Sequence, residues 1–149
     1  MARNSITVNA APQSVYDVLA DPPSYEIWVV GNKSVRGYDP SWPAPGSAFH
    51  HKVGFGLLAI KDKTEALESE PPGRVVMVAR ALPFMRATVS FTIEPEGSGS
   101  RVTMDERARG GPWEALWNPV FDAMVGLRNA ETLRRLKRLA EVRAGVVHR

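Results

Sequence analysis

Residues 112–143 of the chain read PWEALWNPVFDAMVGLRNAETLRRLKRLAEVR. Because proline suits the first turn of a helix, Pro112 and Pro119 predict two helix starts, the second opening a helix that continues to about Arg143. The apolar side chains recur at steps of three and four positions: Leu116, Val120, Ala123, Leu127, Ala130, Leu133, Leu136 and Ala140. A single apolar stripe of this kind predicts a long amphipathic helix that must lie on a broad apolar surface.

The remaining surface of this helix is charged. Arg128, Glu131, Arg135 and Arg138 lie away from the stripe, so we expect them to point to solvent. Basic residues are concentrated in the second half of the helix, where they are interleaved with the leucines of the stripe. We interpret them as a solvated helix face, and we expect no nucleic acid as a partner.

The surface for the helix comes from the middle of the chain. Between Gly46 and Glu106 apolar and polar residues alternate, which is the pattern of strands with one buried face. Segments rich in glycine and proline separate the strands, at 54–56, 70–73, 82–83 and 96–100. Successive strands joined by short turns predict an antiparallel meander, apolar on one face and polar on the other.

The first forty residues add two strands and two short helices. Strands are predicted at 5–9 and 31–38, one helix begins at Pro12 and stops before Asp21, and the other covers 24–29. The predicted fold class is therefore α+β. In this fold a curved antiparallel sheet of six to seven strands grips the long C-terminal helix, and the two short helices close one end.

Composition narrows the classes of protein further. The 149 residues predict one domain, residues 1–149, and 44% hydrophobic with 23% charged residues are usual for a soluble globular chain. No apolar run is long enough to span a membrane, and the N-terminus lacks the apolar core of a signal peptide. We therefore expect a cytoplasmic monomer or homodimer without integral membrane association. The absence of cysteine excludes disulfides and thiolate metal sites, and we expect no cofactor.

Several motifs resemble those of a known fold family. They are residues 11–22 (APQSVYDVLADP), Tyr25, Trp28, residues 42–47 with Phe49, residues 70–74, residues 99–104 (GSRVTM) and residues 133–137 (LRRLK). With the order of elements, they resemble the helix-grip fold of the START/SRPBCC superfamily, whose members include birch-pollen-allergen-like proteins. Within it, the chain looks like the polyketide cyclase/dehydrase and lipid-transport branch. The resemblance implies a cavity between sheet and helix that takes apolar small molecules, and some members catalyse cyclisation, dehydration or hydrolysis there.

The apolar residues that face inward are the predicted ligand contacts. From the strands these are Phe49, Leu58, Ile60, Met77, Val89, Phe91 and Met104, and from the helical segments Trp28, Trp113, Trp117, Phe121 and Met124. We expect a cavity of roughly a few hundred Å³, the usual size of a ligand pocket. Gly126 lies mid-helix, at a cost of about 1 kcal/mol relative to alanine, so it marks either a close approach to the sheet or a void. The alternative is that the same side chains fill the core.

Strict alternation also places three ionisable side chains on the inner face: His51, Asp62 and Glu106. Such groups are costly in an apolar cavity unless paired or hydrated, and they often mark function. His51 is the candidate general acid or base, with Asp62 or Glu106 as a second proton carrier or a substrate anchor. No spacing in the chain matches a metal site.

A structural role for these three groups is the alternative. Each would then lie at the cavity mouth or a strand end, bonded to the backbone or to an arginine such as Arg80 or Arg86. A two-residue turn at 54–55 would pair His51 with Leu58, so we expect no direct contact between His51 and Asp62.

Three functions fit these observations. The preferred one is binding or carriage of a small hydrophobic molecule, such as a lipid, an isoprenoid or an aromatic polyketide, because the inner face is apolar with few ionisable groups. The second is an enzyme of the cyclase/dehydratase type, with proton transfer by His51 and Asp62. The third is a protein-interaction module of the same fold, which would need an exposed apolar patch and a filled core.

Overall fold

The computed structural model describes residues 2–55, 57–82, 85–109 and 118–146. Its strands are β1 (Ala2–Val8), β2 (Asn32–Tyr38), β3 (Ala48–Phe55), β4 (Leu58–Glu70), β5 (Arg74–Leu82), β6 (Met85–Glu96) and β7 (Gly99–Ala108). Its helices are α1 (Pro12–Leu19), the 3-10 helix η1 (Pro22–Ser24), α2 (Tyr25–Trp28) and α4 (Pro119–Arg143). The predicted α+β class and the upper end of the predicted strand number are confirmed.

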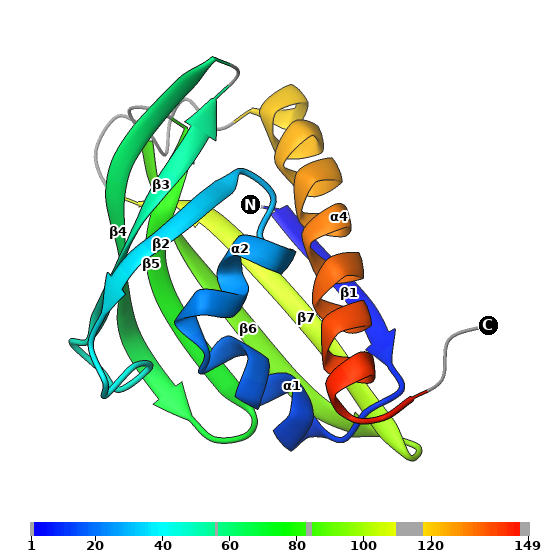
Figure 1. The fold of residues 1–149 in the computed structure, drawn as a ribbon. Helices are drawn as coiled ribbons and strands as arrows, with labels where there is room; N and C mark the ends of the chain where they lie inside the picture. Colours follow the sequence, from blue (N-terminus) through cyan, green and yellow to red (C-terminus); the bar gives the residue numbers. More distant parts are fainter. Residues whose placement is uncertain (1, 56, 83–84, 110–117, 147–149) are drawn as a thin grey trace.

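The strands form one antiparallel sheet in the order β1-β7-β6-β5-β4-β3-β2. Strands β2 to β7 follow one another as a meander, and the N-terminal strand β1 pairs with β7, so that Ile6 lies opposite Val102. The sheet curves around α4, while α1 and α2 cover its lower part (Figure 1). This is the helix-grip arrangement that the sequence predicts.

Local sequence explains where the helices begin. Pro119 opens α4, and the side chain of Asn118 caps it by accepting a hydrogen bond from the Phe121 N–H at 2.9 Å. Pro12 opens α1 without a side-chain cap, and Val15 is among the α1 residues buried in the core. The second predicted helix start, Pro112, lies outside the described residues.

The predicted apolar stripe of α4 is correct in one half of the helix and wrong in the other. Leu133, Leu136 and Ala140 are buried in the core as predicted. Val120 and Leu127 are instead 73% and 76% exposed, and Ala123 is exposed too. The buried side of the first half begins at Val125 and continues through Asn129 and Thr132. The prediction failed because it required the buried side to be apolar, whereas this helix buries polar groups there.

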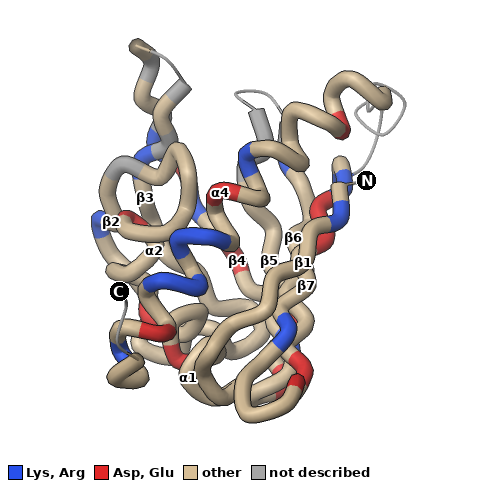
Figure 2. The backbone as a smooth tube through the Cα atoms, turned by 90° about the vertical axis from the view of Figure 1, so that its right-hand side faces the viewer, with Lys and Arg blue, Asp and Glu red and all other residues tan. Residues whose placement is uncertain are grey.

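Basic residues cover the outer side of α4 in its second half. Figure 2 shows them as blue segments along the helix, and the structure places Arg134, Arg135 and Arg138 at exposed positions. Glu131 accepts hydrogen bonds from Arg134 and Arg135 on this side. The expected solvated face is therefore present from residue 131 onward, although Arg128 does not belong to it.

Candidate ligand-binding cavity

A cavity lies between the inner face of the sheet and helices α2 and α4. Its volume is about 80 Å³, well below the few hundred Å³ predicted. Apolar side chains of β3, β5, β6 and β7 form much of the wall, and α4 supplies polar groups. Several residues of the lining are partly exposed, and we infer that the cavity opens beside Val30, Asn32 and Arg128, which are among them. The prediction of size assumed an empty interior, whereas large aromatic side chains occupy much of it.

Six of the predicted ligand contacts line this cavity: Trp28, Phe49, Met77, Val89, Phe91 and Met104. Trp28 packs edge-on against Phe91 with 5.8 Å between the ring centroids. The cross-strand pair Ala79 and Ala87 leaves space beside these large side chains. Their positions follow from the strand alternation, while their role in binding remains a prediction.

Two other predicted contacts, Phe121 and Met124, do not line the cavity. Met124 is 55% exposed on the outer side of α4, and Phe121 is half-buried but is not part of the cavity wall. Both assignments relied on the incorrect orientation of the first half of α4. Leu58 and Ile60 belong to β4, but their side chains lie outside the described part of the structure, as do Trp113 and Trp117.

His51 lies in the cavity wall, where it is 5% exposed. Its Nε2 is 2.8 Å from the Thr64 hydroxyl oxygen of the neighbouring strand β4. The ring also packs against Phe49, with 5.2 Å between the centroids. These contacts fix the orientation of the imidazole toward the cavity, which a proton-transferring group requires.

The predicted register of the β3–β4 hairpin is wrong. Strand β3 continues to Phe55, which pairs with Leu58, and His51 therefore lies directly opposite Asp62 instead of Leu58. The Asp62 carboxylate is nearly buried and accepts a hydrogen bond from Arg86 Nη1 at 3.0 Å. Asp62 is not part of the cavity wall. The arginine partner predicted by the structural alternative is thus confirmed for Asp62.

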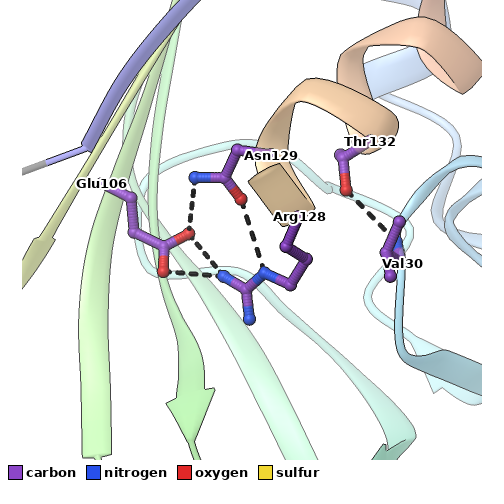
Figure 3. A network of polar contacts seen from close by, with 5 residues as sticks. All are labelled: Val30, Glu106, Arg128, Asn129 and Thr132. Carbon is purple, nitrogen blue, oxygen red and sulfur yellow. Dashed lines mark hydrogen bonds and ion pairs between the residues drawn. The ribbon is translucent and has the colours of Figure 1, made fainter. Parts of the chain in front are cut away.

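Glu106 lies in the wall on the opposite side and is only 2% exposed. Arg128 Nη2 of α4 donates to both of its carboxylate oxygens, at 2.8 and 2.7 Å, and Asn129 Nδ2 lies 3.3 Å from one of them (Figure 3). An arginine was predicted as a partner, but Arg80 and Arg86 were the candidates and Arg128 was assigned to solvent. The pair links strand β7 to α4 across the cavity.

Sequence reasoning missed the polar side of the cavity. Arg128, Asn129 and Thr132 of α4 all face it, and the Thr132 hydroxyl accepts a hydrogen bond from the Val30 N–H at 3.3 Å (Figure 3). One signal in the sequence is that three polar residues occur within five positions, away from the apparent stripe. A second signal is the predicted inward direction of Glu106. A buried carboxylate needs a cation as a partner, and Arg128 of the facing helix could have been identified as that cation.

Tyr25 lines the cavity but is not a candidate for acid–base chemistry. Burial raises the pKa of its hydroxyl well above the ordinary value, and the hydroxyl donates to the Leu19 carbonyl oxygen at 2.7 Å. The Trp42 indole N–H donates to the same carbonyl at 2.9 Å. The two rings therefore anchor α2 and the 39–47 loop to the end of α1.

Other kinds of site have little support in the described residues. Within them, no three histidine, aspartate or glutamate side chains gather in a way that could hold a metal ion. The helices there include none with the length and apolar character needed to cross a membrane.

Comparison with known proteins identifies the family. The sequence model described as polyketide cyclase / dehydrase and lipid transport matches residues 2–141. The chain belongs to this family. The family and the helix-grip fold support a hydrophobic ligand-binding function in general terms. No curated protein matches the chain.

Solved structures with the same fold have low sequence identity to this chain. CV1439 from Chromobacterium violaceum has a TM-score of 0.71 and 17% identity, with 93% of this chain and 96% of that one covered. The di-domain aromatase/cyclase StfQ of the steffimycin biosynthetic pathway has a TM-score of 0.72 and 18% identity, with 97% of this chain and 51% of that one covered. Ara h 8.0201 has a TM-score of 0.71 and 8% identity, with 94% and 96% covered. At these identities the likeness concerns the fold.

Proposed function

We propose that this protein binds a small, largely apolar molecule in the cavity between the sheet and α4. The observation that carries the proposal is the lining itself. Aromatic and methionine side chains from the sheet and α2 meet a polar side on α4, which is the usual composition of a small-molecule site. Membership of the polyketide cyclase/dehydrase and lipid transport family supports the same conclusion.

The cavity volume limits the size of the bound group. An apolar cavity of about 150 Å³ takes one benzene ring, so the 80 Å³ here takes a ring only if the wall yields. Met77 and Met104 supply that adaptability, since methionine has a flexible side chain that repacks easily. The rest of a larger ligand would extend through the mouth beside Arg128.

Native mass spectrometry and calorimetry test this proposal. Freshly purified protein is first inspected for a co-purifying apolar molecule, and is then titrated with phenol, toluene, 1-naphthol, 1-methylnaphthalene and decanoic acid. We expect one-to-one binding of at least one of them. A protein that carries no ligand and binds none of these compounds would contradict the proposal.

A matched pair of variants locates the binding site. Ala87→Leu adds three carbons to a fully buried position of the wall and should lower affinity at least tenfold. Gly126→Ala adds one carbon to α4 away from the cavity, where a new Cβ meets no atom within 4 Å, and should leave affinity unchanged. Ala79→Leu repeats the test if Ala87→Leu does not fold. Equal affinities in all three would place the ligand elsewhere.

A second candidate function is an enzyme of the cyclase/dehydratase type, and the position of His51 favours it. The imidazole is buried in the cavity wall, and Thr64 orients it. The two carboxylates already have charged partners, Arg86 for Asp62 and Arg128 for Glu106, and Asn129 also contacts Glu106. His51 is therefore the stronger candidate for proton transfer. The expected chemistry is removal of a proton next to a carbonyl group of the bound molecule.

His51→Gln separates the two candidates. The variant keeps a polar side chain of similar size but cannot act as a base, so an enzyme would lose turnover of a polyketide-like substrate while retaining its affinity. A binding protein shows no turnover in either form. Turnover that survives the substitution would remove His51 from the chemistry.

A further inference from the structure

The side-chain oxygen of Asn32 is buried at the cavity and has no hydrogen-bond partner within the described residues. Buried polar atoms in folded proteins nearly always have a partner, because an acceptor without one loses its bonds to water and gains nothing in return. The described residues supply no donor for this oxygen, and a group of a bound molecule could supply one. The cavity that Asn32 lines is the place from which it can come.

The backbone holds Asn32 in this position. Gly31, at φ +92°, adopts a left-handed conformation that suits glycine, and its carbonyl accepts a hydrogen bond from the Gly54 N–H at 2.8 Å. The Asn32 N–H donates to the Val29 carbonyl at 3.2 Å. Asn32 pairs with Val53 in β3, two positions from the cavity residue His51, so it lies on the same face of the sheet.

We propose that Asn32 Oδ1 accepts a hydrogen bond from a hydroxyl group of the bound molecule. This inference rests on the proposed function and specifies the ligand as an apolar body with a neutral hydrogen-bond donor at the mouth. A neutral donor such as a hydroxyl suffices, because the two charged groups of the cavity wall, Glu106 and Arg128, already compensate each other. A ligand with only acceptor atoms would leave the Asn32 oxygen unpaired.

Three single-ring compounds of similar shape test the donor. Phenol has a hydroxyl donor, anisole has an ether oxygen that only accepts, and toluene has neither. Their affinities for the full-length protein are measured by calorimetry, together with those of the corresponding naphthalene compounds. We expect the hydroxyl compound of each set to bind about tenfold more tightly than the other two, the effect of one added hydrogen bond.

Variants of Asn32 and a matched asparagine assign the effect. Asn32→Leu, with Asn32→Ala as the second variant, should abolish the preference for the hydroxyl compound and leave toluene bound. Asn4 is the control, because its side-chain oxygen is also buried without a partner in the described residues but does not line the cavity. Asn4→Leu should keep the preference, while losing the bond from Asn4 Nδ2 to the Gly126 carbonyl.

The remaining outcomes contradict either the role of Asn32 or the proposed function, and the measurements distinguish the two. Equal binding of phenol, anisole and toluene overturns this inference, with water then satisfying Asn32, and leaves the proposed function intact. A preference that persists in folded Asn32→Leu or Asn32→Ala also overturns it, as does tight binding of anisole. If no compound of either set binds and no ligand co-purifies, the proposed function fails and this inference fails with it.

Discussion

The two halves of α4 bury different kinds of side chain, although they form one continuous helix. The second half places Leu133, Leu136 and Ala140 in the core. The first half turns Val120 and Leu127 to solvent and presents Asn129 to the cavity, which Thr132, just past the middle of the helix, also lines. The second half thus follows the hydrophobic pattern, and the first departs from it beside the candidate site. Departures of this kind are expected where a helix lines a site as well as a core.

The largest expected difference between the halves concerns stability. Leu136→Ala removes a side chain with no exposed surface and should lower the free energy of unfolding by about 2–5 kcal/mol. Leu127→Ala, at a position that is 76% exposed, should change it by less than about 0.5 kcal/mol. Urea unfolding of both variants measures the two values. Similar losses would mean that Leu127 is covered in solution.

The second difference concerns charge. Arg128→Met removes the charged partner of the buried Glu106 carboxylate and leaves the Asn129 amide as its contact on the described part of α4. The free energy of unfolding should fall by about 2 kcal/mol. This is below the value for a fully buried pair because the Arg128 side chain is 29% exposed. Adding Glu106→Gln to Arg128→Met should restore part of the stability, since the unpaired charge is then gone.

A surface pair in the second half is the matched control. Arg135 contacts Glu131 at 3.1 Å on the exposed side of the helix, so Arg135→Met should lower the unfolding midpoint far less than Arg128→Met does. Equal losses for Arg128→Met and Arg135→Met would contradict the structural role assigned to the Glu106–Arg128 pair.

The fold could be predicted from the sequence because its signals are long and redundant. Alternation over the strands from residue 46 onward, together with Pro119 and the leucines after residue 130, defines a curved sheet gripping a helix. The same alternation placed His51 and Glu106 on the inner face. Alternate side chains of a strand point to the same face of the sheet, so the inward positions can be predicted without knowing which residues form each turn.

The details of the site depend on short signals that the sequence leaves ambiguous. Gly54-Phe55-Gly56 allows more than one turn position, and the choice decides whether His51 lies opposite Leu58 or Asp62. The orientation of α4 near Arg128 depends on a buried carboxylate from β7, which is distant in sequence. The apolar periodicity of a helix depends only on its own sequence, so it contains no information about the Glu106 carboxylate of β7.

A smaller effect is expected at Gly126 in the first half. Alanine is a better helix former than glycine, and a Cβ at this position meets no atom within 4 Å. Gly126→Ala should therefore raise the free energy of unfolding by about 0.5–1 kcal/mol, as measured by urea unfolding. A loss of stability would mean that the new methyl group does meet neighbouring atoms, for example those of β1, from which Asn4 bonds to the Gly126 carbonyl.

The smallest effect is on the exposed side of the second half. The hydrogen bond from Arg135, with the charges of Arg134 and Arg138, lowers the pKa of Glu131. A lowered folded-state pKa stabilises the fold above the ordinary glutamate pKa, and this contribution is lost as the pH falls through the folded value. Arg135→Met should raise the pKa of Glu131 toward its ordinary value, which NMR titration of the carboxyl group measures. An unchanged pKa would mean that the Arg135–Glu131 hydrogen bond does not persist in water. The Glu106–Arg128 pair differs because the Glu106 carboxylate is buried.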